Sequence, residues 1–190
     1  DALVERLSVI NVGDPLDSET TMGPVVDQAQ KNRVLDYIEK GKQEGASLIC
    51  GGGVPEDTPE GGYYLEPTLF DGVTTEQVIA KEEIFGPVLS VLQWKDKSDL
   101  LEKANATPMG LTANIITRRV DWAISAAREV EAGCVWINGR GQHYLETPFG
   151  GYKDSGLGSE GSMESLQSYT RLKALHILDL EEIGNEGELS

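Results

Sequence analysis

Apolar residues recur every three to four positions in several segments of the chain, which is the spacing of an amphipathic helix. The helices predicted in this way lie before Gly13 and over about 25–44, 99–106, 121–132 and 163–169. Short runs rich in apolar residues and bounded by turn-forming residues are typical of strands. The strands predicted in this way lie at 46–50, 88–94, 111–117, 134–138 and 174–180. Strands that alternate with helices predict an α/β fold with a largely parallel βαβ sheet and helices on both faces.

Two details refine this pattern. Asp27 stands four residues before Lys31, a spacing at which opposite charges support a helix. Pro67 separates two apolar runs, 63–65 and 68–70. Because proline has no amide hydrogen to donate to a neighbouring strand, we expect this segment to lie at the edge of a sheet.

Composition narrows the class of protein. The chain has 190 residues, of which 39% are hydrophobic and 25% charged, as in a globular domain. Asp and Glu number 32 and Lys and Arg 16, for a net charge of −16, which disfavours binding to a nucleic-acid backbone. We find no apolar run long enough for a membrane span, and two cysteines make no disulfide framework. These features favour a reducing, cytoplasmic location.

Three patterns could carry chemistry. Residues 156–161 match G-x-G-x-x-G, but polar, turn-like residues precede them, which favours a turn that starts a helix over a phosphate cradle. Cys134 could be a nucleophile with His143 or His176 as its base, yet its apolar strand favours a packing role. The Cys, His and acidic residues show no metal-ligand spacing. The loop 82–87, just before a predicted strand, stands where α/β proteins often place ligand contacts.

Four motifs occur in order along the chain. They are Glu82-Glu83-Ile84-Phe85-Gly86-Pro87-Val88, Asn105 to Leu111, Gly133-Cys134-Val135-Trp136-Ile137-Asn138, and Pro148-Phe149-Gly150-Gly151-Tyr152-Lys153-Asp154-Ser155-Gly156. Their sequence and spacing resemble the C-terminal part of the NAD(P)-dependent aldehyde dehydrogenase superfamily. Shorter matches extend the resemblance over nearly the whole chain up to Leu178.

The resemblance implies an oxidoreductase that converts an aldehyde to a carboxylic acid with NAD or NADP through a cysteine thiohemiacetal. Glu83 matches the acid that hydrogen-bonds the nicotinamide ribose, and Phe85 matches the aromatic residue beside the nicotinamide. Leu111 matches the aliphatic residue that presses on the ring. Phe149 matches an aromatic residue of the aldehyde passage, and His143 and Tyr144 lie in the loop 140–147 where the family varies its substrate choice.

The same resemblance places the family's nucleophilic cysteine, general-base glutamate and cofactor domain before Asp1. We therefore expect a partial catalytic domain over 1–138, then a substrate loop, final helix and oligomerisation strand over 139–180, and an acidic tail over 181–190. On this basis the chain carries no catalytic residue of its own and is inactive alone, in a protein that forms a homodimer or homotetramer. The alternative is a stand-alone, non-catalytic dehydrogenase-like module that acts in oligomerisation.

Overall fold

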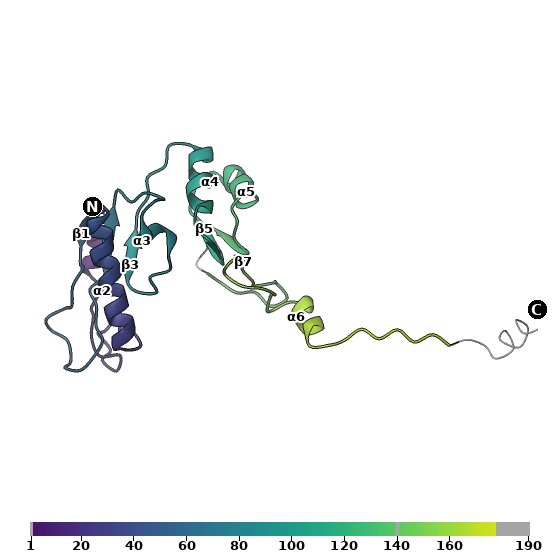
Figure 1. The fold of residues 1–190 in the computed structure, drawn as a ribbon, viewed down its shortest axis with the longest axis horizontal. Helices are drawn as coiled ribbons and strands as arrows, with labels where there is room; N and C mark the ends of the chain where they lie inside the picture. The colour runs from purple at the N-terminus through teal and green to yellow at the C-terminus, as the bar shows by residue number, and fades with distance from the viewer. Residues whose placement is uncertain (1, 140, 178–190) are drawn as a thin grey trace, which may run out of the picture.

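The structure is a computed structural model that describes residues 2–139 and 141–177. Its helices are α1 (Ala2–Ser8), α2 (Gln28–Gln43), α3 (Val78–Lys81), α4 (Lys97–Asn105), α5 (Val120–Ala127) and α6 (Met163–Ser168). Its strands are β1 (Ser47–Cys50), β2 (Thr68–Asp71), β3 (Val88–Ser90), β4 (Met109–Gly110), β5 (Thr112–Ile115), β6 (Cys134–Ile137) and β7 (Tyr152–Lys153). Figure 1 shows one group of elements from α1 to β3 and a second from α4 to α6, followed by an extended segment.

The long helix α2 supplies one side of the main apolar core. Asp27 precedes the helix and accepts a hydrogen bond from the Gln30 amide at 2.7 Å, so it caps the helix N-terminus. The expected helix-supporting pair between Asp27 and Lys31 is therefore replaced by a cap. Val34 and Ile38 on the buried face of α2 pack in one cluster with Phe70 of β2. All three side chains are at most 1% exposed, which makes this cluster the centre of the first group of elements.

The first sheet has the order β1-β2-β3, with β1 and β2 antiparallel and β2 and β3 parallel. The expectation of an edge position for residues 68–70 is wrong, because β2 is the central strand. Pro67 lies just before β2, so its missing amide hydrogen removes no bond from the ladder. The next residue, Thr68, already donates its amide hydrogen to the Pro87 carbonyl at 2.8 Å.

The remaining strands form two separate pairs, antiparallel β4 with β7 and parallel β5 with β6. The expectation of an α/β chain is confirmed, whereas the single, largely parallel sheet is wrong for the residues described. Alternation of strands and helices predicts the kind of element but leaves open which strands pair, since pairing depends on contacts between distant parts of the chain.

Several predicted boundaries also move. The strand expected over 88–94 ends at Ser90, and the helix expected to reach residue 132 ends at Ala127. Residues 174–177 form no strand, and the rest of the predicted oligomerisation strand and the acidic tail lie outside the described residues. None of the helices described has the length and apolar character needed to cross a membrane.

Candidate functional site

The loop 82–87 is attached to helix α2 by side chains of the helix. Gln30 donates from its amide nitrogen to the backbone carbonyls of Ile84 and Phe85, at 3.0 and 2.9 Å. Arg33, one turn further along α2, donates to the carbonyl of Glu83 at 3.1 Å. Three successive carbonyls of the loop are therefore bonded to one rigid helix, which fixes the direction in which the Glu83 side chain leaves the loop.

A second set of contacts fixes the start and end of the same loop. The buried Tyr37 phenol donates to Oε2 of Glu82 at 2.6 Å and accepts a hydrogen bond from Arg33 at 3.0 Å. The hydrogen bond to Glu82, with burial and the negative charge of Glu82, raises the pKa of Tyr37 above its usual value. At the other end of the loop, a Cβ on Gly86 would lie 2.4 Å from Cγ2 of Val34, so only glycine allows this approach.

Three neighbouring hollows share lining residues. The first, of about 610 Å³, is lined by Glu83 and Leu111, among other residues. The second, of about 890 Å³, is lined by Leu111 and Phe149. The third, of about 410 Å³, is lined by Phe149, His143 and Tyr144. We call these three hollows together the groove. It brings together five of the six residues predicted from the sequence.

Aromatic side chains cluster at the third hollow. The rings of His143 and Phe149 meet edge to face with centroids 4.5 Å apart, and Trp136 of β6 meets His143 in the same way at 6.0 Å. Trp136 donates from its indole nitrogen to the carbonyl of Gln142 at 2.9 Å, and the Tyr144 hydroxyl donates to the Gln142 side chain at 2.9 Å. The strand β6 therefore supports the loop that carries His143 and Tyr144.

At the middle of the groove, three backbone segments approach one another closely at glycines. The amide of Gly133 donates to the carbonyl of Gly110 at 3.0 Å, next to Leu111. A Cβ on Gly133 would lie only 1.8 Å from the carbonyl oxygen of Gly150, next to Phe149. Because the atom that this Cβ would meet belongs to the backbone, glycine at position 133 allows the segments that carry Leu111 and Phe149 to approach each other.

Phe85 differs from the other predicted residues. Its side chain is 73% exposed and does not line the first hollow with Glu83. Its φ of 57° lies in the left-handed region, which is uncommon for a residue other than glycine and is often found at functional sites. The bond from Gln30 to the Phe85 carbonyl helps to hold this conformation.

Of the other candidate patterns, the G-x-G-x-x-G segment lines part of the second and third hollows, whereas neither cysteine lines the groove. Cys134 lies within β6, and among the described residues neither cysteine thiol is hydrogen-bonded to a histidine. In the G-x-G-x-x-G segment, Glu160 pairs with Phe149 through two backbone hydrogen bonds of 2.7 and 2.9 Å. This segment precedes the short helix α6, as the helix-starting turn requires. In the part of the chain that the structure describes, no group of three His, Cys, Asp or Glu side chains could hold a metal ion.

Comparison with known proteins identifies the class to which this fold and groove belong. A family model for the aldehyde dehydrogenase family matches residues 1–175, and the chain belongs to that family. It is 47% identical to a betaine aldehyde dehydrogenase of Brucella anthropi over 176 residues, which cover 92% of this chain and 36% of that protein. The chain thus spans about a third of the length of the curated relatives it matches.

Solved structures agree with this assignment. An aldehyde dehydrogenase from Bacillus cereus, a G224D mutant, superimposes with a TM-score of 0.86 and 42% identity, over 91% of this chain and 35% of that one. A Mycobacterium tuberculosis aldehyde dehydrogenase complexed with NAD⁺ superimposes with a TM-score of 0.86 and 36% identity, over 90% of this chain and 35% of that one. Both are proteins with an α/β fold.

Sequence reasoning missed the residues that hold the groove in place. Gln30, Arg33 and Tyr37 were predicted only as members of a helix, although they lie at i, i+3 and i+7 and so share one face. That spacing is a usable signal for a contact surface, but it does not name the loop that the surface contacts. Trp136 was part of a motif without a predicted role, and the structure shows it against His143.

Proposed function

We propose that this chain supplies part of the active site of an aldehyde dehydrogenase that oxidises an aldehyde to a carboxylic acid with NAD or NADP. The observation that carries the proposal is that Leu111 lines one hollow with Glu83 and the neighbouring hollow with Phe149. Family membership and the NAD⁺ complexes of related enzymes support it. When bound, the cofactor accepts a hydride from the substrate, and the residues of this chain position the two reactants.

The groove residues fit the nicotinamide end of such a cofactor. The exposed carboxylate of Glu83 has free lone pairs that can accept hydrogen bonds from the two hydroxyls of a ribose. Leu111 is 40% exposed and offers an apolar surface to one face of a flat ring. Glu83 and Leu111 are far apart in sequence but line the same hollow, so both can contact one ligand. Phe85, exposed on the same loop as Glu83, is the proposed aromatic contact to the nicotinamide.

At the other end of the groove, Phe149, His143 and Tyr144 form the proposed wall of the aldehyde passage. Aromatic side chains exclude water, and their ring faces bind an apolar or cationic substrate body. Among the described residues of the groove there is no cysteine, so we propose that the nucleophile comes from outside this chain. We accordingly expect the isolated 190-residue chain to show no turnover of aldehyde with NAD or NADP.

A chimera tests the proposal directly. The 176 matched residues of the Brucella anthropi enzyme are replaced by those of this chain, and NADH formation with betaine aldehyde and a panel of other aldehydes is recorded. We expect aldehyde-dependent NADH formation that falls at least tenfold in kcat/KM when Glu83→Gln is introduced, since a hydrogen bond to a charged group contributes about 1.5–3 kcal/mol. A folded chimera without aldehyde-dependent NADH formation would refute the proposal.

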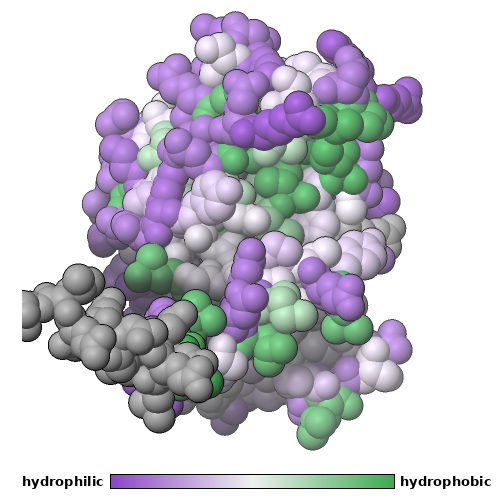
Figure 2. Space-filling view, turned by 90° about the vertical axis from the view of Figure 1, so that its right-hand side faces the viewer, coloured by the Kyte–Doolittle hydropathy of each residue, from purple (hydrophilic) through white to green (hydrophobic). Residues whose placement is uncertain are grey.

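A second candidate function is self-association. Leu172, Leu175 and Ile177 in the extended segment after α6 are 104%, 77% and 85% exposed, and in extended backbone Leu175 and Ile177 lie on the same side as Lys173. On the face shown in Figure 2, further apolar residues gather in groups separated by hydrophilic ones. We propose that this segment pairs with another subunit in a homo-oligomer. A monomeric mass in light scattering at every protein concentration from about 1 to about 100 μM would contradict the proposed self-association.

The cellular location remains a proposal of the same kind. Cys50 and Cys134 are both free thiols, which suits a reducing, cytoplasmic location.

A further inference from the structure

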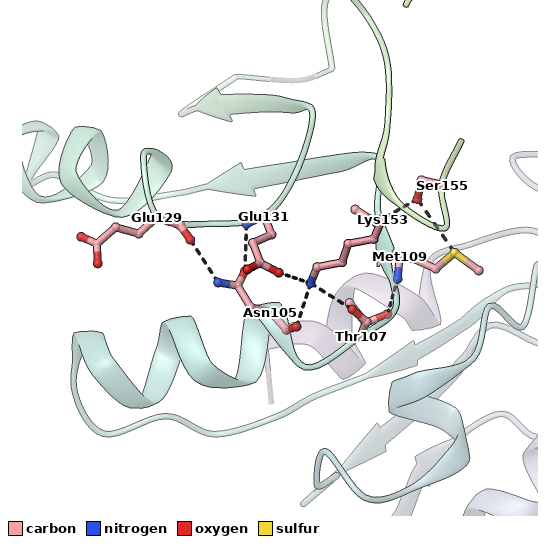
Figure 3. Close-up of polar contacts among 8 residues, drawn as sticks. Asn105, Thr107, Met109, Glu129, Glu131, Lys153 and Ser155 are labelled. Atoms are coloured by element: carbon pink, nitrogen blue, oxygen red, sulfur yellow. Dashed lines mark hydrogen bonds and ion pairs between the residues drawn. The ribbon is translucent and has the colours of Figure 1, made fainter. Parts of the chain in front are cut away.

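The Lys153 side chain is at the centre of a polar network beside the groove. Its ammonium nitrogen lies 2.8 Å from the carbonyl oxygen of Asn105, 3.1 Å from that of Thr107 and 2.5 Å from Oε2 of Glu131. Figure 3 shows Lys153 in contact with these three residues. An ammonium group has three hydrogens to donate, and here each has an acceptor. One side chain, that of Lys153, therefore contacts the end of α4, the turn that follows it and the loop after α5.

The backbone of Lys153 also has an unusual conformation. Its φ of 52° lies in the left-handed region, which costs a residue other than glycine about 1 kcal/mol or more and persists only where the surroundings impose it. The side chain is only 23% exposed, less than that of its partner Glu131 at 53%. Among the described residues, Lys153 is the only ion-paired lysine with a positive φ.

Asn105 closes the network on the side of α5. Its amide nitrogen donates to the carbonyl of Glu129 at 3.0 Å, and its side-chain oxygen accepts from the Glu131 amide at 2.8 Å. Asn105 thus holds the backbone of residues 129–131 while Lys153 holds the carbonyl of Asn105 and the carboxylate of Glu131 (Figure 3). Two elements that are distant in sequence are joined by side chains that each make at least two bonds.

The network ends directly at the groove. The amide of Gly110 donates to the Ser155 hydroxyl at 2.8 Å, and a Cβ on Gly110 would lie 2.4 Å from the carbonyl oxygen of Glu131. Gly110 is therefore held between the two loops that Lys153 connects. The next residue is Leu111, which lines both the first and the second hollow.

We propose that Lys153 is a positioning residue, which fixes the turn 107–110 and through it the place of Leu111 in the groove. This inference rests on the proposed function only in assigning Leu111 to the ring of the cofactor. Lys153 does not line the first or second hollow, so it acts through the backbone and not on a ligand. Because a misplacement of about 1 Å can cost up to 100-fold in rate, loss of this anchor should lower kcat more than it weakens cofactor binding.

The first arm of the test needs no activity. Amide hydrogen exchange is compared in the 190-residue chain and in its Lys153→Met and Lys153→Arg variants. We expect exchange over 107–111 to become at least about tenfold faster in Lys153→Met, with α2 unchanged, and to return toward the original rate in Lys153→Arg, which keeps the charge and donors. The matched control is Lys97→Met, which loses an ion pair to Glu129 and a bond to Ser125 without touching the turn.

The second arm uses the chimera described above. We expect Lys153→Met to lower kcat about tenfold while KM for NAD changes less than about threefold, and Lys153→Arg to recover most of the loss. If the unsubstituted chimera is active and exchange over 107–111 is the same in Lys153→Met and Lys97→Met, the positioning role is refuted. If exchange responds as expected but the folded chimera forms no NADH, the anchor stands and the proposed function fails.

Discussion

The approach of the loop 82–87 to helix α2 allows a quantitative prediction for Gly86→Ala. The added Cβ would lie 2.4, 3.0 and 3.3 Å from Cγ2, Cγ1 and Cβ of Val34. Carbon atoms prefer about 3.5–4.0 Å, so the first contact overlaps by about 1 Å or more. Val34 is 0% exposed and is held within the core, so it has no open space into which to move. The φ of Gly86 is not in the left-handed region, so the cost of alanine comes from this contact alone.

We expect Gly86→Ala to lower the free energy of unfolding by about 1–3 kcal/mol, the usual cost of overpacking a core. Val34→Ala should cost about 2 kcal/mol, because it removes two buried methyl groups and leaves a small cavity. In the double variant both close methyl groups are gone and only the 3.3 Å contact to Cβ remains. The two costs should therefore fall short of additivity by about 1 kcal/mol or more.

Urea unfolding followed by circular dichroism measures all four members of this cycle. The reasoning is refuted if Gly86→Ala changes the free energy of unfolding by less than about 0.5 kcal/mol, or if the two substitutions are additive within that margin. In either case the loop and the helix would not be in the close contact that the structure shows.

Two further predictions concern the same supports. Tyr37→Phe removes the hydrogen bond to Glu82 and should cost about 1–2 kcal/mol at neutral pH, measured by urea unfolding. The raised pKa of Tyr37 means that its contribution is fully present below about pH 10, the value for an unfolded tyrosine, and is lost as pH rises through the folded value. A Tyr37→Phe variant with unchanged stability from pH 9 to pH 11 relative to the original would contradict this. Gly133→Ala places a Cβ 1.8 Å from the Gly150 carbonyl oxygen and should cost about 3 kcal/mol or more, read from the urea midpoint. A midpoint unchanged from the original chain would show that the two backbones are not in contact.

The sequence predicted the kinds of element better than their partners. Helical spacing located α2 and α4 to within a few residues, because α2 buries one face and the leucines of α4 are half-buried. The pairing of β2 with both β1 and β3 could not be predicted, since Pro67 suggested an edge and only long-range contacts place the strand in the centre. Asp27 was predicted as a charge partner, although its place before the first helical turn is equally that of a cap.

The family motifs named residues that the structure brings to one groove, but they did not name the residues that support the groove. Glu83, Leu111 and Phe149 come from separate motifs, and the structure brings them to one groove. Their supports were not predicted, because Tyr37 and Lys153 act across 45 and up to 48 residues of sequence. A contact of that range leaves no local pattern in the chain.

The two walls of the groove are stabilised by different means. The wall that carries Glu83 rests on a continuous apolar core, whereas the buried apolar side chains after residue 93, within the described part of the chain, are only Ala123, Ala126 and Ala132. The wall that carries Leu111 and Phe149 thus depends on backbone approach and polar contacts, which salt and denaturant weaken more readily than a packed core. The groove should therefore lose its shape before the chain loses its core, with cleavage by a protease starting on the second wall.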